Sequence, residues 1–397
     1  MLTVEETLAR VLEAVPRLEA ETAPIAAAIG RILTGPVHAA RTLPPWDNSA
    51  MDGYAIRHGD APGRLAVVDA VYAGDRPQRP LSPGECARIQ TGAPLPPGAD
   101  AIVPQEHARR TGDHIQLDAP VSSGAFVRLA GEDTRAGALL LSAGTRVGLA
   151  EAAALWAQGA TSVQVPRRPS VAIASSGDEL APVGSPPSDR LIDTNTPMIA
   201  RAVELTGGRA TPLGLAADRL DAVTDVLARG LTHDVLITVS GASVGDRDFT
   251  RPALTALGVS IEAWKVAMKP GKPFTLGRRG TTVVFGLPGN PVSALVTFEL
   301  FVRPALRAMQ GLSPGPPRLT GRLATAATKP AGLAHFLRAS VTERDGALWA
   351  TPTATQSSGA LSSALGATHL IVLPENATEV PEGASISLIP LSWANEP

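Results

Sequence analysis

The strongest constraint on the fold is an alternation of strand-like and helix-like segments over residues 170–310. Short apolar runs at 171–174 and Val235–Val239 alternate with segments of helical periodicity at 199–205 and 220–228. This alternation predicts a mainly parallel sheet covered by helices on both faces. Sheets of this kind bind ligands in the loops at the carboxyl ends of their strands. The active site is therefore expected in those loops.

Two loops of small and acidic residues follow the predicted strands. The loop 175–180 reads Ser-Ser-Gly-Asp-Glu-Leu, and its small residues would let backbone amides approach an anionic ligand. In isolation it is equally compatible with a glycine turn. The loop 240–248 ends in the carboxylates of Asp246 and Asp248. Mg²⁺ prefers carboxylate oxygens and substrate phosphates, so we expect at least one of the two to bind it, although either could cap a helix starting near Phe249.

A third segment places Lys265, Lys269 and Lys272 within eight residues, next to prolines that fix a turn. Three positive charges so close together predict a site for an oxyanion. The alternative is an ordinary solvated positive surface. In a fourth segment, Asn290 and Pro291 suit the N-cap and first turn of a helix that ends near Met309, with free amides facing a ligand.

Composition excludes several classes of protein. The formal net charge is −2, and the basic residues do not gather into the stripe typical of nucleic-acid binding. No apolar run approaches the roughly 20 residues of a membrane helix, and residues 1–10 do not resemble a secretory signal, so a cytoplasmic enzyme is expected. The single cysteine, Cys86, can form no internal disulfide and is expected to be a small buried residue.

Changes in pattern along the chain predict four domains. Thr3 and Glu6 form a capping box that opens the chain with a helix. The predicted boundaries are residues 1–43 with 134–167 for a discontinuous N-terminal linker or dimerisation domain, 44–133 for a β-rich inserted domain, 168–311 for the α/β domain, and 318–397 for a small C-terminal β domain after the rigid linker 313–317.

The four segments above, in this order, resemble the molybdopterin molybdenumtransferases, the MoeA and gephyrin E-domain family. The resemblance continues through 47–55 (Asp-Asn-Ser-Ala-Met-Asp-Gly-Tyr-Ala), 90–94 (Gln-Thr-Gly-Ala-Pro), 131–133 (Gly-Glu-Asp) and 269–273 (Lys-Pro-Gly-Lys-Pro). It therefore covers most of the chain. The number and order of these motifs make the resemblance specific.

The resemblance implies a multidomain α/β plus β fold, with a central three-layer α/β molybdopterin-binding domain and a C-terminal domain similar to a small β-barrel. It also implies a homodimer whose active site draws on both subunits. The implied reaction inserts molybdate into adenylyl-molybdopterin and releases AMP with the help of Mg²⁺. The adenylyltransferase of the same pathway and molybdoenzyme chaperones are possible protein partners, and neither nucleic acid nor a membrane is expected.

The resemblance, together with the loops described above, gives the expected site. The catalytic positions are Asp52, Asp133, Glu179, Asp218, Asp248, Lys265 and Lys269. The substrate-binding positions are Thr91, Ser176, Gly177, Asp193, Asn195, Ser240, Gly241, Ser243, Gly245, Lys272, Pro288, Gly289, Asn290, Arg338 and Ser358. The metal ligands are Asp248, Asp246, Glu179 and Asp218.

One departure from the family affects the ranking of these ligands. The family's loop commonly reads Ser-Gly-Gly-x-Ser-x-Gly, whereas residues 240–245 are one residue shorter. Alignment through the gap makes Asp248 the counterpart of the family's aspartate and Asp246 that of a more variable acid, so Asp248 ranks first.

Two other functions are compatible with parts of the sequence. The stretch 246–250 also resembles the adenylyltransferase that acts one step earlier in the pathway. Such proteins typically consist of the central domain alone. A gephyrin-type scaffold that clusters receptors through its dimer is the alternative from another class. A scaffold would not need Asp52, Asp248, Lys265 and Lys269 together, and this chain has all four. The flanking domains and these residues favour the molybdate step.

Overall fold

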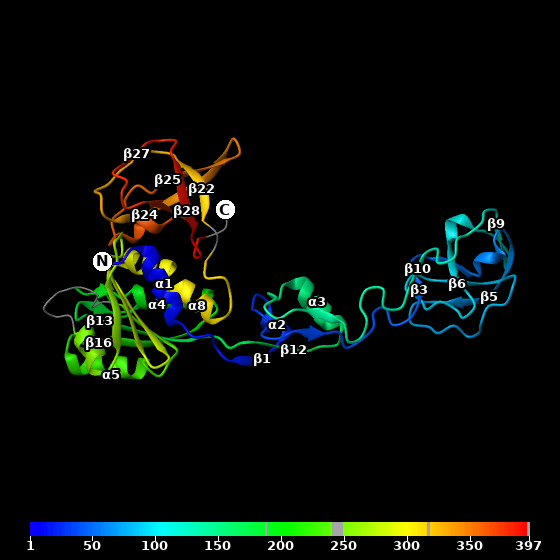
Figure 1. The fold of residues 1–397 in the computed structure, drawn as a ribbon, viewed down its shortest axis with the longest axis horizontal. Helices are drawn as coiled ribbons and strands as arrows, with labels where there is room; N and C mark the ends of the chain where they lie inside the picture. The colour runs from blue at the N-terminus through cyan, green and yellow to red at the C-terminus, as the bar shows by residue number, and fades with distance from the viewer. Residues whose placement is uncertain (187–188, 240–248, 316–317, 395–397) are drawn as a thin grey trace. The chain divides into compact units, whose positions relative to one another are not determined.

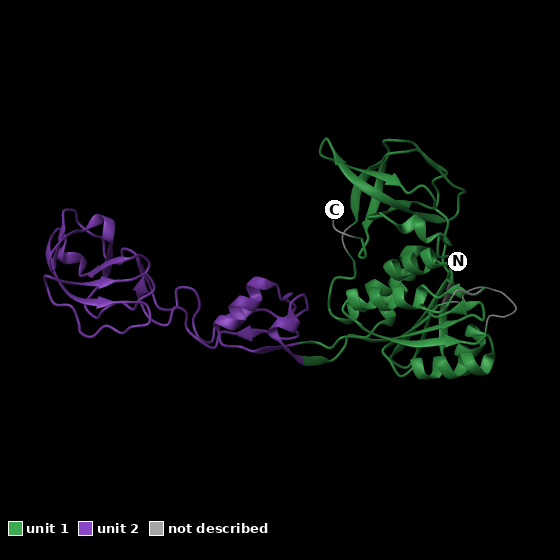
Figure 2. Ribbon diagram, turned by 180° about the vertical axis from the view of Figure 1, so that it is seen from behind, with its two compact units in different colours: residues 1–21, 165–397 green, residues 22–164 purple. Residues whose placement is uncertain are grey.

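The computed structural model describes residues 1–186, 189–239, 249–315 and 318–394. The chain divides into two compact units (Figure 2). One comprises Met1–Glu21 with Val165–Pro397, and the other comprises Thr22–Gln164. None of the helices within the described ranges is long and apolar enough to cross a membrane.

The first unit contains the expected α/β sheet (Figure 1). Four neighbouring strands are parallel, and two antiparallel strands extend one edge. The mainly parallel arrangement is therefore confirmed. In spatial order the strands are β16 (Arg209–Ala216), β13 (Ser170–Ser176), β17 (Val235–Val239), β21 (Thr282–Leu287), β20 (Pro273–Arg279) and β18 (Ser260–Lys265).

Helices cover both faces of this sheet because successive side chains of each strand point to opposite faces. On β13, Val171 and Ile173 pack in one apolar cluster, whereas Ala172 and Ala174 pack in another. The expected three-layer architecture is thereby confirmed. The first cluster includes α1 (Val4–Ala14), α4 (Asn195–Leu205), α7 (Pro291–Thr297), the π-helical η3 (Phe298–Val302) and α8 (Arg303–Met309), and the second includes α5 (Leu220–Gly230) and α6 (Thr250–Ala256).

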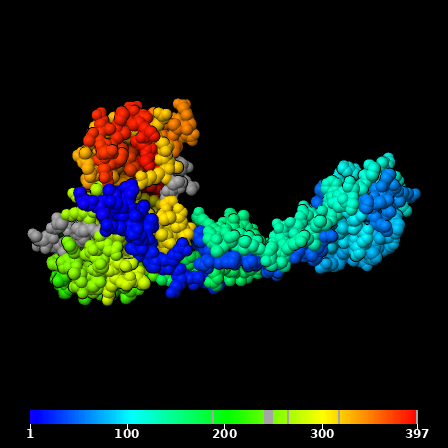
Figure 3. Space-filling view, viewed as in Figure 1, coloured from blue at the N-terminus to red at the C-terminus, as the bar shows by residue number. Residues whose placement is uncertain are grey.

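The C-terminal part of the same unit is a closed five-stranded β-barrel, in which β24 pairs with both β25 and β26. The barrel-like prediction is confirmed. On the face shown in Figure 3, these residues form one solid body in orange and red. The order around the barrel is β24 (Ala334–Arg344), β25 (Ala347–Pro352), β22 (Leu319–Leu323), β28 (Ser385–Pro390) and β26 (His369–Leu373), and β19 (Met268–Lys269) adds to β24 in parallel.

The second unit, Thr22–Gln164, is built mainly on a six-stranded sheet with an apolar cluster on each face. Cys86 is fully buried in one of these clusters, as expected. The sheet order is β7 (Ala101–Pro104), β4 (Gly53–Ile56), β6 (Glu85–Ile89), β5 (Gly63–Val71), β9 (His114–Leu117) and β8 (Arg109–Thr111). Shorter elements are α2 (Ile25–Ala28), α3 (Leu149–Ala157), β2 (Val37–His38) with β11 (Leu139–Leu141), and β3 (Asn48–Ser49) with β10 (Val127–Arg128).

The predicted helix starts are confirmed with one refinement. The Thr3 amide donates to Glu6 at 2.8 Å and the Glu6 amide donates to Thr3 Oγ1 at 3.1 Å, which completes the capping box before α1. Asn290 is the N-cap of α7 and Pro291 occupies its first turn, but the Asn290 side chain makes no capping hydrogen bond. The helix that follows reaches Met309 only through the π-helical segment η3.

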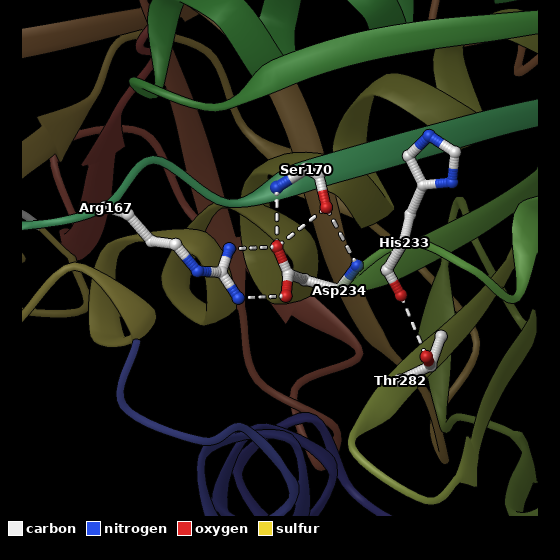
Figure 4. A network of polar contacts seen from close by, with 5 residues as sticks. All are labelled: Arg167, Ser170, His233, Asp234 and Thr282. Atoms are coloured by element: carbon white, nitrogen blue, oxygen red, sulfur yellow. Dashed lines mark hydrogen bonds and ion pairs between the residues drawn. The ribbon is translucent and has the colours of Figure 1, made fainter. Parts of the chain in front are cut away.

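A polar network fixes the ends of β13 and β17 that lie opposite the loops expected to bind ligand (Figure 4). The two terminal guanidinium nitrogens of Arg167, Nη1 and Nη2, each donate to Asp234 at 2.6 Å. The Ser170 amide and hydroxyl donate to the same carboxylate at 2.8 and 2.7 Å. Burial by itself would raise the pKa of Asp234, but these hydrogen bonds and the Arg167 charge lower it to about 2. The carboxylate is therefore ionised in the folded protein at neutral pH.

We expect Asp234→Asn to lower the free energy of unfolding by about 1–2 kcal/mol at pH 7, because a charged acceptor of four hydrogen bonds is lost. The folded pKa lies below the unfolded value of about 3.9, so this stabilisation is present above the unfolded pKa and is lost as the pH falls towards the folded pKa. Scanning calorimetry should show a melting temperature lower by about 2–4 °C at pH 7 and a smaller difference at about pH 4. Asp225→Asn, on the exposed face of α5, is the control. Equal melting temperatures at pH 7 would contradict the assigned role.

Candidate functional site

A cavity of about 720 Å³ lies at the carboxyl ends of the parallel strands. It begins where β13 and β17 end, at Ser175 and Val239, and it extends to the start of α7. Its position agrees with the location expected for ligands of such sheets. The lining also includes Glu179, Leu180, Leu191, Ile192, Asp193, Thr194, Asn195, Pro273, Pro288, Gly289, Asn290, Pro291, Gly359 and Leu361.

Six of the expected site residues therefore line one cavity. They come from three loops that are far apart in sequence but follow neighbouring strands or precede helices. The six are Glu179, Asp193, Asn195, Pro288, Gly289 and Asn290. Ser240, Gly241, Ser243, Gly245, Asp246 and Asp248 lie outside the described residues.

Asp193 holds the start of α4 at the cavity. Its Oδ1 accepts hydrogen bonds from the amides of Asn195 and Thr196, both at 3.1 Å. The Thr196 hydroxyl in turn lies 2.7 Å from the Ser175 hydroxyl in a buried pair at the end of β13. One Asp193 oxygen is thus engaged in capping the helix, which fixes the backbone beside the cavity.

The loop after β21 is tied to α4 and to the C-terminal domain. Asn195 Nδ2 donates to the Gly289 carbonyl at 2.7 Å, and Asn195 Oδ1 is buried without a partner among the described residues. Asn290 Nδ2 donates to Ser358 Oγ at 3.1 Å, and the Val292 amide donates to the Ser358 carbonyl at 3.2 Å. Ser358 therefore contributes to the site by holding the N-terminus of α7.

The acidic loops carry the expected metal ligands Glu179 and Asp218. The Asp178 amide donates to Asp218 at 3.3 Å, and the Asp218 amide donates to Asp178 at 3.2 Å, so the two loops are joined. Gly177 has φ of +151°, and a Cβ there would lie 2.9 Å from both Glu179 carboxylate oxygens, so another residue would be strained and would displace this carboxylate. Within the described ranges, no three acidic, histidine or cysteine side chains cluster as a metal site would require.

A second cavity, of about 510 Å³, lies where β19 meets the barrel. Its wall carries the cationic or titratable side chains of Lys269, Lys329, His335 and Arg338. Of the three lysines predicted to form one oxyanion site, only Lys269 lines it. Lys265 and Lys272 are exposed and are not among its lining residues.

Arg338 is the most deeply buried charge in this wall, with 1% of its surface exposed. Burial lowers its pKa to about 10, so it remains protonated at neutral pH. Its guanidinium donates only to neutral oxygens, of Phe336, Ser357 and Ser363, at 3.2–3.5 Å. Its Nε has no partner among the described residues. A buried cation without a counter-ion favours an anionic ligand.

Ser176 is the last residue of β13 in the first unit and is not among the residues that line the larger cavity, whereas Asp52, Thr91 and Asp133 lie in the Thr22–Gln164 unit. Asp52 Oδ1 accepts hydrogen bonds from the Thr91 amide at 2.7 Å and the Thr91 hydroxyl at 2.8 Å. The hydrogen bond from the Thr91 backbone amide is the main reason why the pKa of the Asp52 carboxyl is lowered. Asp133 is anchored in the same unit through its amide, which donates to the Leu43 carbonyl at 3.2 Å. Asp52 and Thr91 thus form a local pair.

The expected site residues did not include Ser175, Thr196, Lys329 or His335, although Ser175 begins the loop 175–180 that was expected to approach an anionic ligand. Ser175 and Thr196 flank expected residues, so their proximity to the site could have been predicted. No sequence pattern marks Lys329 or His335, because closure of the barrel brings them beside Lys269.

Comparison with known proteins identifies the relatives of this chain. Three family models match in succession: the MoeA N-terminal region (domain I and II) at residues 2–159, a probable molybdopterin binding domain at 172–308, and the MoeA C-terminal region (domain IV) at 320–391. The chain is 38% identical over 331 residues to the molybdopterin molybdenumtransferase of Nostoc sp., covering 79% of this chain and 76% of that protein. It is 35% identical to molybdopterin molybdenumtransferase 2 of Mycobacterium tuberculosis, covering 98% and 99%.

Solved structures give the same result. The crystal structure of a molybdopterin biosynthesis MoeA protein from Pyrococcus horikoshii superposes with a TM-score of 0.85 at 30% sequence identity, over 98% of this chain and 99% of that chain. The family models cover nearly the whole chain, and the relative from M. tuberculosis aligns from end to end. The chain therefore belongs to the MoeA family, the molybdopterin molybdenumtransferases.

Proposed function

We propose that this chain transfers molybdenum from molybdate to adenylylated molybdopterin and releases AMP in a Mg²⁺-dependent reaction. The observation that carries the proposal is the pair of cavities in one unit, of about 720 and 510 Å³. The larger is of the size that small-molecule ligands occupy, and the smaller is walled by cations. The segment 269–273 contributes to both, through Pro273 in the first and Lys269 in the second.

If the larger cavity holds a pyrophosphate, a divalent cation would be needed to offset the repulsion between the phosphate charge and the acidic lining. Its lining includes the carboxyl groups of Glu179 and Asp193 and no lysine or arginine among the described residues. Bound Mg²⁺ would neutralise the phosphate charge during cleavage of the phosphoanhydride bond. Glu179 and Asp218, with Asp248 and Asp246 outside the described residues, are the proposed ligands.

The smaller cavity is the proposed place for molybdate, with Lys269 and Arg338 binding its oxygens. The thiolates that become molybdenum ligands must come from the dithiolene of the substrate, because soft thiolates suit this metal and the chain has one cysteine. Burial raises the pKa of the Cys86 thiol to about 12, so it supplies no thiolate. The role of the protein is positioning and electrostatics, with no covalent enzyme intermediate.

We expect AMP release from adenylyl-molybdopterin to require both Mg²⁺ and molybdate, and Asp248→Asn to slow it by about 100-fold or more. Chromatographic measurement of AMP, with Asp225→Asn as a matched control, tests this. Formation of the adenylylated compound from ATP would instead move the assignment one step earlier. If the protein bound the substrate but released no AMP, the scaffold function would be the remaining interpretation.

We expect Lys269→Ala to raise the molybdate concentration for half-maximal rate by about tenfold or more, because a charge-assisted contact is lost. Binding of adenylyl-molybdopterin in the other cavity should be unchanged in equilibrium titrations. Arg344→Ala, at the exposed end of β24, is the control. An unchanged molybdate dependence would remove Lys269 from the oxyanion site.

The homodimer implied by the resemblance is also part of this proposal. In the Thr22–Gln164 unit, one face of α3 exposes Leu149, Ala153 and Trp156, the last with half of its surface accessible. An apolar helix face of this kind is typical of a protein interface. We expect Trp156→Asp to shift sedimentation from dimer towards monomer, whereas Asp225→Asn should not. Equal sedimentation of native protein and Trp156→Asp would assign the interface elsewhere. The pathway adenylyltransferase and molybdoenzyme chaperones remain proposed partners.

A further inference from the structure

His335 has an unusual position in the cationic cavity. It lies on β24, where it pairs in register with Lys269 of the neighbouring strand β19. Only 8% of its surface is exposed, and it lines the cavity together with Lys329 and Arg338. Among the described residues, its ring makes no hydrogen bond or ion pair, so its nitrogens are available to a ligand in the cavity.

The charged side chains that line the cavity around His335 are all positive. Lys329 is only 7% exposed, and its Nζ donates to three backbone oxygens, of Leu333 at 2.9 Å, Glu375 at 3.1 Å and Pro330 at 3.3 Å. None of the described residues that line the cavity is Asp or Glu. The side chain of Glu375, beyond the end of β26, is the nearby acid that acts on Lys329. Among the described residues, the side-chain hydrogen bonds of Lys329 and Arg338 thus all go to neutral oxygens.

This environment keeps His335 neutral in the empty site. Burial, followed by the charges of Lys329 and Lys269, lowers the pKa of His335 to about 4. A further positive charge here would add to the repulsion among Lys269, Lys329 and Arg338, in a cavity whose described lining contains no Asp or Glu. A dianion in the cavity reverses this balance, because a nearby negative charge favours the protonated imidazole.

We propose that His335 takes up a proton when a tetrahedral oxyanion enters the cavity, so that oxyanion binding is coupled to proton uptake. The inference rests on the oxyanion placement proposed above and goes beyond it. His335 then acts as a specificity-determining residue, because a protonated imidazole adds an N–H donor and a charge only when a dianion is present. Without a dianion, the neutral ring avoids adding a third buried charge to those of Lys329 and Arg338.

The coupling has a definite sign. A ligand that raises the pKa of a group binds more tightly at low pH, and its affinity falls as the pH rises from the pKa of the free protein towards that of the complex. For one proton the affinity changes by up to tenfold per pH unit in this window. Lys269, Lys329, Arg338 and Glu375 are the charged groups that surround His335, and Arg338, with its pKa lowered to about 10, stays protonated near neutral pH.

The test uses sulfate, a tetrahedral dianion whose own charge is constant between about pH 5.5 and 8. Isothermal calorimetry on the full chain, in two buffers of different ionisation enthalpy, reports both affinity and proton uptake. We expect native protein to take up a fraction of a proton per sulfate near pH 6 and to bind several-fold more tightly there than at pH 8. His335→Gln keeps an N–H donor but cannot titrate, so its affinity should be independent of pH and its proton uptake absent.

His369→Gln is the matched control. This second barrel histidine also has a pKa lowered by burial, but it bonds to Thr368 and does not line the cavity. It should keep the native pH dependence. One contrary outcome is that native protein binds sulfate equally well at every pH and that Arg338→Ala abolishes this binding. That result would overturn the proton coupling and leave the oxyanion site intact. Absence of sulfate and molybdate binding at every pH would overturn both.

Discussion

The pairing of β19 with β24 is the interaction on which the candidate site depends. The Ala334 amide donates to the Ala267 carbonyl at 2.9 Å, and the Ala267 amide donates to the Leu2 carbonyl at 2.8 Å, so three distant segments meet there. Because backbone hydrogen bonds fix the register, Lys269 of the α/β domain stands beside His335 of the barrel. A slip of one residue would turn Lys269 away from the cavity.

The turn after β19 is equally constrained. Gly271 has φ of +107°, and a Cβ at this position would lie 2.5 Å from Thr297 Cγ2 of α7. Only glycine permits this conformation and this close approach. The same turn leads to Pro273, which lines the larger cavity. One short segment therefore sets the position of groups in both cavities, which is a structural reason for the two ligands to be handled in the same part of the molecule.

Much of the fold could be predicted from the sequence because local periodicity and capping residues agree with the tertiary structure. The strand Val235–Val239, the capping box at Thr3 and the N-cap at Asn290 all follow from such local signals. The Asn290 side chain illustrates the limit. It bonds to Ser358 and not to its own helix, since a partner from the C-terminal domain competes for it.

The candidate site likewise contains residues that could be predicted from the sequence and residues that could not. Glu179 and Asn195 were expected at the larger cavity because their loops follow or precede elements of one sheet, and parallel strands bring such loops together. Lys329 and His335 are separated from Lys269 by about sixty residues and share no motif with it. Only closure of the barrel gives them a common wall, so their chemistry depends on tertiary structure alone.

The two cavities differ in the charge of the groups that would face an anionic ligand. This difference bears on the order in which the two substrates bind. In the larger one, under the proposed function, the carboxyl groups of Glu179 and Asp193 would make binding of a phosphate ligand dependent on a mobile cation that can leave with the product. In the smaller one, Arg338 and Lys329 are buried and cannot leave, so their charge is always present. In the proposed reaction, a fixed positive site whose described lining contains no Asp or Glu favours capture of an oxyanion before the other substrate arrives, because ligand binding offsets the cost of burying these cations. The geometry is therefore suited to an enzyme that holds its metal oxyanion in advance and reacts when the dithiolene becomes available.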